Sequence, residues 1–281
     1  MQNGKQIGNL VYGGLTLLLM AAVLLNGCQR AASKQGQAQL TLAKKQYEGK
    51  DYTLAAHTLT DFLNREGNVQ EAAEAYYLRG MCYRYREPPK NALAEEDFLQ
   101  AVKKNSNGPV RTWAYAALGH IYFETRTDKQ DRAVAYYQNA LKALKDAPPK
   151  DAVLYRLGVA LQRLGQWKEA DVHLSRCFNT FGSSMYASYA RRYFGARTWR
   201  IQFGAFANLN AASQLVAELT GASWQADWQP QRDNGRLLYI VRGGQYPTFL
   251  AAYKDLDRAQ ATHPEAMAVA VALPKLQPPD K

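Results

Sequence analysis

The chain has 281 residues, 47% of them hydrophobic and 21% charged, which excludes a wholly disordered protein and accommodates one to three domains. The formal net charge is +11, yet residues 198–281 hold eight basic and seven acidic residues, so the positive excess lies in the earlier part of the chain. This excess either attracts acidic partners, such as lipid headgroups or an acidic protein, or is a solvated basic surface.

The amino terminus has the pattern of a secretory signal peptide over residues 1–27. Lys5 supplies a positive charge, and the apolar run of residues 10–25 is shorter than the ~20 residues needed to span a bilayer. Residues 25–28, Leu-Asn-Gly-Cys, resemble the bacterial lipobox, although asparagine replaces the usual small residue. The resemblance implies that the thiol of Cys28 is lipidated and that the signal is removed before it. The alternative is an uncleaved membrane anchor with an incidental cysteine.

The residues that follow bear on location. Gln29 is not Asp, and similarity to enterobacterial sorting then implies lipid anchoring to the outer membrane, facing the periplasm. Residues 28–38 are mostly small and polar, which predicts a tether between the lipid and the first helix.

Residues 39–197 contain an internal repeat. Gly80, Gly119 and Gly158 are each 39 residues apart, and a frame of Ala, a large apolar residue and a small residue follows each of them. The pattern resembles the tetratricopeptide repeat, a pair of helices that stacks into an α-solenoid. Glycine within a helix costs about 1 kcal/mol relative to alanine, which is tolerable where the paired helix approaches closely.

In such a solenoid the first helix of each repeat lines the inner surface. The register of the family then predicts a protein-binding groove, although aromatic residues at helical spacing can equally be core. The predicted groove residues are Tyr77, Arg84, Trp113, His120, Tyr155 and Gln162.

Residues 198–275 change pattern, and a tail of residues 276–281 follows. Strands are predicted at 199–206, 224–228, 237–242 and 267–273, with helices after Asn208 and Thr248. This order is β-α-β-β-α-β, the ferredoxin-like plan. The predicted fold class is therefore an α-solenoid followed by a small α/β sandwich.

The first strand, Ile-Gln-Phe-Gly-Ala-Phe at 201–206, and the third-strand segment 238–246 resemble the SPOR domain. The resemblance implies binding of peptidoglycan, especially of denuded glycan strands, on the exposed sheet face. Strand alternation and the family pattern select the candidate contacts, among which the tryptophan could equally be core. They are Arg200, Gln202, Trp228, Leu238, Ile240 and Arg242.

An RNA-binding RRM has the same order of elements, but its aromatic signature belongs on the third strand, where Leu238, Ile240 and Arg242 stand. The near-neutral charge of this segment and the export signal also argue against nucleic acid.

No catalytic motif and no spacing typical of metal ligands occurs in the sequence, so we expect no enzyme activity, metal or cofactor. Cys82 and Cys177 lie within repeat helices and are expected to be buried structural thiols. The acidic run 95–97 is expected to be a solvated helix face.

Together these features predict a non-catalytic envelope lipoprotein that binds peptidoglycan and a protein partner in cell division or cell-wall remodelling, with septal enrichment one expected pattern. Two alternatives remain open at this point. The chain could help to assemble outer-membrane proteins, or it could be a structural tether between membrane and wall.

Overall fold

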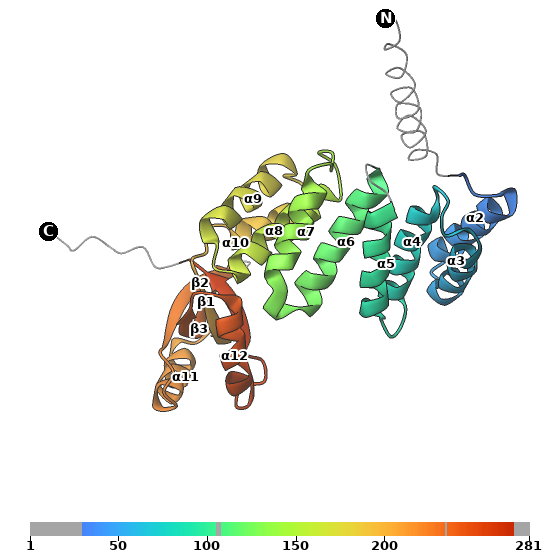
Figure 1. Ribbon diagram of the computed structural model, residues 1–281. Coiled ribbons are helices and arrows are strands. Elements are labelled where there is room, and N and C mark those ends of the chain that lie inside the picture. Colours follow the sequence, from blue (N-terminus) through green and yellow to red (C-terminus); the bar gives the residue numbers. More distant parts are fainter. Residues whose placement is uncertain (1–29, 105–107, 234, 273–281) are drawn as a thin grey trace, which may run out of the picture. The chain divides into compact units, whose positions relative to one another are not determined.

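The computed structural model describes residues 30–104, 108–233 and 235–272. The signal peptide, Cys28, Gln29 and the tail 276–281 lie outside the described residues. Within the described ranges, nine helices precede a four-stranded sheet that carries two further helices (Figure 1). The helical repeats followed by a βαββαβ domain confirm the predicted fold class.

The chain divides into two compact units at residues 104/105. The later repeats share the second unit with the sheet, and the predicted boundary at 197/198 lies between the last repeat helix and the first strand of that unit. The first unit contains α2 (Lys34–Glu48), α3 (Tyr52–Glu66), α4 (Ala72–Tyr85) and α5 (Asn91–Lys104). The second contains α6 (Pro109–Thr125), the short 3₁₀ helix η1 (Thr127–Lys129), α7 (Gln130–Leu141), α8 (Lys150–Arg163), α9 (Trp167–Thr180), α10 (Met185–Tyr193) and the C-terminal domain.

The predicted tether 28–38 is partly wrong, because α2 begins within it at Lys34. Ser33 caps this helix, and its hydroxyl accepts a hydrogen bond from the main-chain N–H of Gly36. The carboxylate of Glu66 in turn accepts hydrogen bonds from the main-chain N–H and the hydroxyl of Ser33. These contacts join the first described residues to α3, so small and polar composition did not mean an unstructured segment.

The repeating glycines lie where paired helices come together. A Cβ atom on Gly80 would lie 2.7 Å from the ring of Phe98, one on Gly119 2.6 Å from Tyr137, and one on Gly158 2.6 Å from Leu174. Such distances are too short for real contacts. The 39-residue recurrence of glycine is therefore a packing requirement of the helix pairs.

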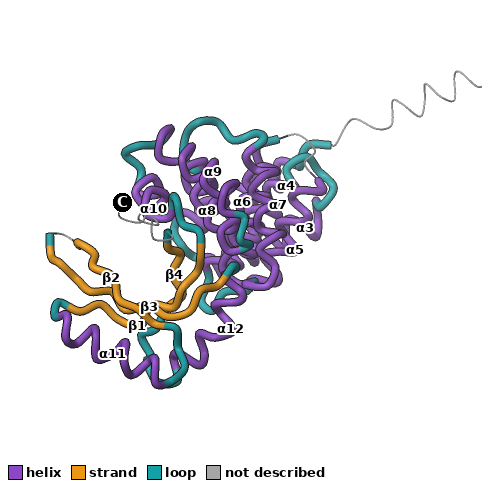
Figure 2. The backbone as a smooth tube through the Cα atoms, turned by 90° about the vertical axis from the view of Figure 1, so that its left-hand side faces the viewer, coloured by secondary structure: helices purple, strands orange, loops and turns teal. Residues whose placement is uncertain are grey.

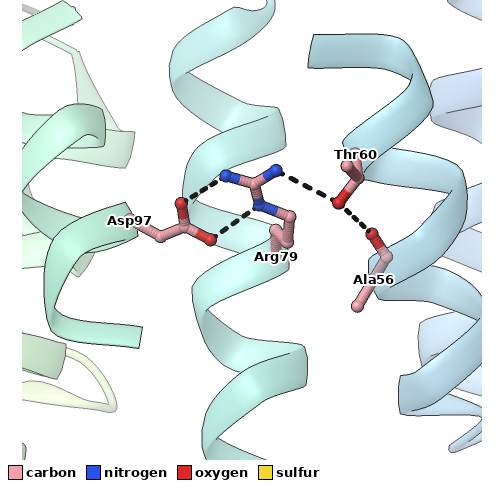
Figure 3. A network of polar contacts seen from close by, with 4 residues as sticks. All are labelled: Ala56, Thr60, Arg79 and Asp97. Atoms are coloured by element: carbon pink, nitrogen blue, oxygen red, sulfur yellow. Dashed lines mark hydrogen bonds and ion pairs between the residues drawn. The ribbon is translucent and has the colours of Figure 1, made fainter. Parts of the chain in front are cut away.

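A buried ion pair lies within the first unit (Figure 3). The Nε and Nη2 atoms of Arg79 on α4 donate to the two carboxylate oxygens of Asp97 on α5, at 2.9 and 2.7 Å. The Nη1 atom of Arg79 donates to the hydroxyl of Thr60 on α3, at 3.1 Å. The Asp97 side chain is only 4% exposed, and burial raises its pKa against the opposing effect of Arg79. The expectation of a solvated acidic face is therefore wrong for Asp97, while Glu96 beside it is exposed.

The C-terminal domain is an antiparallel sheet of order β2-β3-β1-β4, with both helices on one face (Figure 2). Its elements are β1 (Thr198–Phe206), α11 (Leu209–Gly221), β2 (Ala226–Asp233), β3 (Arg236–Tyr246), α12 (Phe249–Gln260) and β4 (Met267–Val271). Asn208 and Thr248 cap α11 and α12 through their side-chain oxygens, as predicted. Strands β2 and β3 are longer than the sequence indicated.

The core of this domain lies between the sheet and its helices. Its buried residues come from the strands, from the two helices and from the loops between them: Ile201, Phe203 and Val241 on strands, Ala212, Leu219 and Ala259 on helices, and Trp224 and Ala266 in loops. Because β1 alternates, the residues between its core positions point to the opposite face.

Within the second unit, β1 is joined directly to α8. The indole Nε1 of Trp199 donates to the main-chain carbonyl of Gln162 at 2.8 Å, and its ring lies 4.9 Å from that of Phe249. The guanidinium of Arg163 lies over the rings of Phe123 and Phe249, at 4.0 and 4.9 Å. We call these five residues the joint between α8 and the C-terminal domain.

Among the described residues, no helix combines the length and apolar character that crossing a membrane would require.

Candidate functional site

The face of the sheet opposite α11 and α12, here called the open face, is the principal candidate site. Strand pairing places Gln202 of β1 opposite Arg242 of β3 on one side and Met267 of β4 on the other. The face combines apolar and polar side chains. They are Arg200, Gln202 and Ala205 on β1, Asp227, Gln229 and Gln231 on β2, Leu238, Ile240 and Arg242 on β3, and Met267 and Val269 on β4.

Gln202 lies at the middle of the open face, as strand alternation predicted. It is half-buried, and its side-chain amide has no hydrogen-bond partner among the described residues. Two N–H donors and a carbonyl acceptor are thus available to a ligand, which suits the hydroxyl and acetamido groups of a sugar chain.

The apolar part of the open face comes from β3. Leu238 is half-buried, and Ile240 is only 5% exposed. A register irregularity between Gln202 and Gly204 places Ala205, rather than Gly204, opposite Ile240. The low exposure of Ile240 makes it a floor of the face rather than a projecting contact.

Arg200 is on the open face, but its side chain is already engaged. Its Nε and Nη2 atoms each donate at 2.9 Å, to the main-chain carbonyls of Gly244 and Arg242. Its Nη1 atom lies 2.9 and 2.8 Å from the two carboxylate oxygens of Asp227. With 6% of its surface exposed, Arg200 joins β1, β3 and β2. The geometry therefore favours a positioning role over the direct sugar contact that the sequence indicated.

Arg242, the second arginine of the open face, is partly exposed. Its Nη2 atom donates a long hydrogen bond of 3.3 Å to Gln231, while its Nε atom is buried without a partner. It forms no ion pair with any described residue, because the carboxylate opposite it, Asp227, is bound to Arg200. Burial, together with the nearby charge of Arg200, lowers the pKa of Arg242. The guanidinium of Arg242 therefore lacks both a counter-ion and a full set of hydrogen-bond partners among the described residues.

The prediction that Trp228 contacts the glycan on the open face is wrong. It lies on the helix-facing side of β2, where its ring meets that of Tyr239 edge-on at a centroid distance of 5.4 Å. Its neighbours Asp227 and Gln229 point to the open face instead. Because Trp228 packs against the core, it cannot form an aromatic platform on the open face.

The residues predicted to line a protein-binding groove lie on α4, α6 and α8. Tyr155 of α8 gathers three tyrosines of α10 around it, with ring centroids 5.9 Å away for Tyr186, 5.7 Å for Tyr189 and 5.9 Å for Tyr193. Arg156 lies over the ring of Tyr186, at 5.3 Å. Burial and the proximity of Tyr193 raise the pKa of Tyr155. We call these four tyrosines the tyrosine cluster.

Sequence reasoning did not identify the α10 members of the tyrosine cluster as candidate binding residues. A signal was present, because intervals of three and four residues place Tyr186, Tyr189 and Tyr193 on one helix face. Tyr189 and Met185 are exposed. The cluster therefore extends to an accessible aromatic and thioether surface.

Of the other predicted groove residues, two pack against the partner helix of their repeat, and two are at least partly exposed. His120 and Tyr77 pack within their own repeats: the Nδ1 atom of His120 lies 2.8 Å from the hydroxyl of Tyr137, and Tyr77 lies against Phe98 with a pKa that burial raises to about 12. Trp113 is 41% exposed, and Arg84 lies 6.0 Å from the ring of Tyr85.

The prediction that Gln162 lines the groove is also wrong. The sequence placed it in the groove, but it is fully buried in the structure. Its side-chain amide donates to the main-chain carbonyl of Tyr193 at 2.7 Å. The main-chain carbonyl of Gln162 accepts a hydrogen bond from the indole N–H of Trp199. Gln162 thus belongs to the packing of α8 against α10 and β1.

The two thiols of the described residues are inaccessible to solvent. Cys82 and Cys177 are buried, and burial raises the pKa of their thiols to about 12 and about 11. Over residues 30–104, 108–233 and 235–272, no cluster of His, Cys, Asp and Glu side chains could hold a metal ion.

Comparisons with known proteins agree with this architecture. The family model of the SPOR domain matches residues 195–270, and that of the tetratricopeptide repeat matches residues 152–184. No curated protein sequence matches the chain. Among solved structures, the crystal structure of PilW, described as a widely conserved type IV pilus biogenesis factor, is similar, with a TM-score of 0.42 and 21% identity. The match covers 53% of this chain and 63% of that one, so the chain spans less than two thirds of it.

Both matched families are non-catalytic, and the SPOR domain indicates a place in the cell envelope. The chain thus joins tetratricopeptide repeats, which are protein-interaction elements, to a C-terminal SPOR domain, which is a peptidoglycan-binding domain.

Proposed function

We propose that this protein is an envelope lipoprotein that docks on denuded glycan strands and recruits a protein of cell division or wall remodelling. The observation that carries the proposal is the open face, where the unpartnered amide of Gln202 lies on the same surface as the apolar Leu238 and Ile240 and the partly satisfied Arg242. A sugar strand offers both hydroxyl groups and apolar ring faces, so this mixture of side chains suits it.

Gln202→Ala is expected to weaken binding of the full chain to amidase-treated peptidoglycan several-fold. The lost hydrogen bonds are worth ~0.5–1.5 kcal/mol each, and the fold should persist because Gln202 points away from the core. Cosedimentation of the full chain in detergent with peptidoglycan measures the effect. Gln214→Ala, the same change at an exposed position of α11, is the matched control. Equal sedimentation of both variants and the wild type would refute the role of the open face.

The lipid anchor is supported by the sequence of residues 25–28, and Cys28 is the proposed acceptor. Cys28→Ser should abolish incorporation of radiolabelled palmitate and leave an uncleaved or soluble chain, because serine has no thiol to acylate. Cys82→Ser is the control, since that thiol is buried in α4. Equal labelling of the Cys28 variant and the wild type contradicts the anchor.

For protein recruitment we propose the surface at the tyrosine cluster. A photo-crosslinking amino acid in place of Tyr189 is expected to give a discrete crosslinked product in cells, because exposed aromatic side chains dominate binding energy at protein interfaces. The same amino acid in place of Val172, which is exposed on α9, should give none. Matching products at both positions would argue against a specific surface.

Imaging a fluorescent fusion separates the proposed role from the two alternatives. Enrichment at the septum supports an adaptor in division, whereas even peripheral labelling fits a membrane–wall tether or an assembly factor.

A further inference from the structure

The open face contains a cation that the fold leaves under-satisfied. Arg242 has a buried Nε atom with no partner and a single long hydrogen bond to Gln231. Buried polar groups are almost always paired, so a buried N–H without a partner calls for a structural or functional explanation. The terminal nitrogens of this partly exposed side chain are the ones a ligand can reach, and of these only Nη2 has a hydrogen-bond partner among the described residues.

The neighbouring charges make this position receptive to an anion. Asp227 stands opposite Arg242 in the strand register, yet both of its carboxylate oxygens face the guanidinium of Arg200. Arg200 itself bonds to the main-chain carbonyl of Arg242. Two guanidinium groups and one carboxylate therefore share this part of the open face, which leaves a local positive charge.

The chemistry of the glycan supplies a matching group. In intact peptidoglycan, the lactyl carboxyl of each N-acetylmuramic acid is joined to the stem peptide as a neutral amide. Removal of the peptide by an amidase hydrolyses that amide, and the lactyl group is left as a free carboxylate. Denuded strands thus differ from intact ones by a regularly spaced negative charge as well as by the missing peptide.

We propose that Arg242 binds the lactyl carboxylate of denuded glycan, with Arg200 and Asp227 holding it in place. The inference rests on the proposed glycan binding and gives it a chemical basis for selecting peptide-free strands. Arginine is suited to this task because its planar fork donates two parallel hydrogen bonds to a carboxylate, and such charge-assisted bonds are roughly twice as strong as neutral ones.

The test compares two forms of the same amidase-treated strands. In one form the lactyl carboxylates are free, and in the other they are converted to neutral N-methylamides by carbodiimide coupling with methylamine. The full chain in detergent should bind the capped strands at least about tenfold more weakly, a ratio that corresponds to ~1.4 kcal/mol. Arg242→Gln should bind both forms equally, at the capped level.

Arg232→Gln is the matched control. Arg232 is exposed and lies on the other face of β2, so this variant loses the same charge but should still distinguish the two forms. Equal binding of both forms by the wild type would overturn the inference and leave the proposed function standing, whether or not the variants fold. Discrimination that persists in Arg242→Gln would also overturn it. Absence of binding to either form would instead overturn the proposed function.

Discussion

Gly119→Leu is expected to lower the free energy of unfolding of the second unit by about 3 kcal/mol. A Cβ atom at this position would lie 2.6 Å from the ring of Tyr137, and the larger side chain must force α6 and α7 apart. Overpacking of a close contact typically costs 1–3 kcal/mol, and the hydrogen bond between Tyr137 and His120 would be disturbed as well.

Urea unfolding followed by tryptophan fluorescence measures this effect, because all five tryptophans lie after residue 108. Gly221→Leu is the control, since a Cβ atom on Gly221 meets nothing within 4 Å. If Gly119→Leu unfolds at the same urea concentration as the wild type, the close packing of the repeat helices at glycine is refuted.

Asp97→Ala is expected to cost about 3–5 kcal/mol of stability in the first unit. The substitution leaves the guanidinium of Arg79 without its counter-ion, and an uncompensated charge in a protein interior is strongly destabilising. Glu96→Ala, one residue earlier on the exposed face of α5, should change stability by less than about 0.5 kcal/mol. Far-UV circular dichroism during urea unfolding reports on these helices, since the first unit contains no tryptophan.

The double variant Arg79→Met, Asp97→Leu sharpens this test. Replacement of a whole buried ion pair by apolar residues of similar volume is often neutral, so the double variant should recover most of the lost stability. Loss of the same size in the single and double variants would show that packing, rather than the unpaired charge, is responsible.

The periodic features of the sequence predicted most of the fold. Gly80, Gly119 and Gly158 identified the helix pairs, and the capping residues Asn208 and Thr248 marked where the domain helices begin. Such signals are local or strictly repeating, so they can be interpreted without knowledge of the tertiary contacts.

The wrong predictions for individual residues have a different physical cause. In each case the environment of the side chain is set by residues elsewhere in the chain. Asp97 belongs to an acidic run, and only the position of Arg79, 18 residues earlier, makes it a buried partner. Gln162 is buried because Tyr193 and Trp199 pack upon it. For Trp228, the sequence did not reveal which face of β2 would meet the helices, and the pairing of Asp227 with Arg242 decides it.

The joint between α8 and the C-terminal domain has a mechanical consequence. Only residues 194–197 separate α10 from β1, and the Trp199 indole and the Arg163 guanidinium join the same two parts through side chains. In a protein docked on glycan, tension in the wall would enter through β1 and pass into α8, beside Tyr155 of the tyrosine cluster. A flexible linker would extend under this tension and would not pass it on to the repeats. The short connection and the joint instead favour its transmission as strain to the repeat that carries the proposed partner surface.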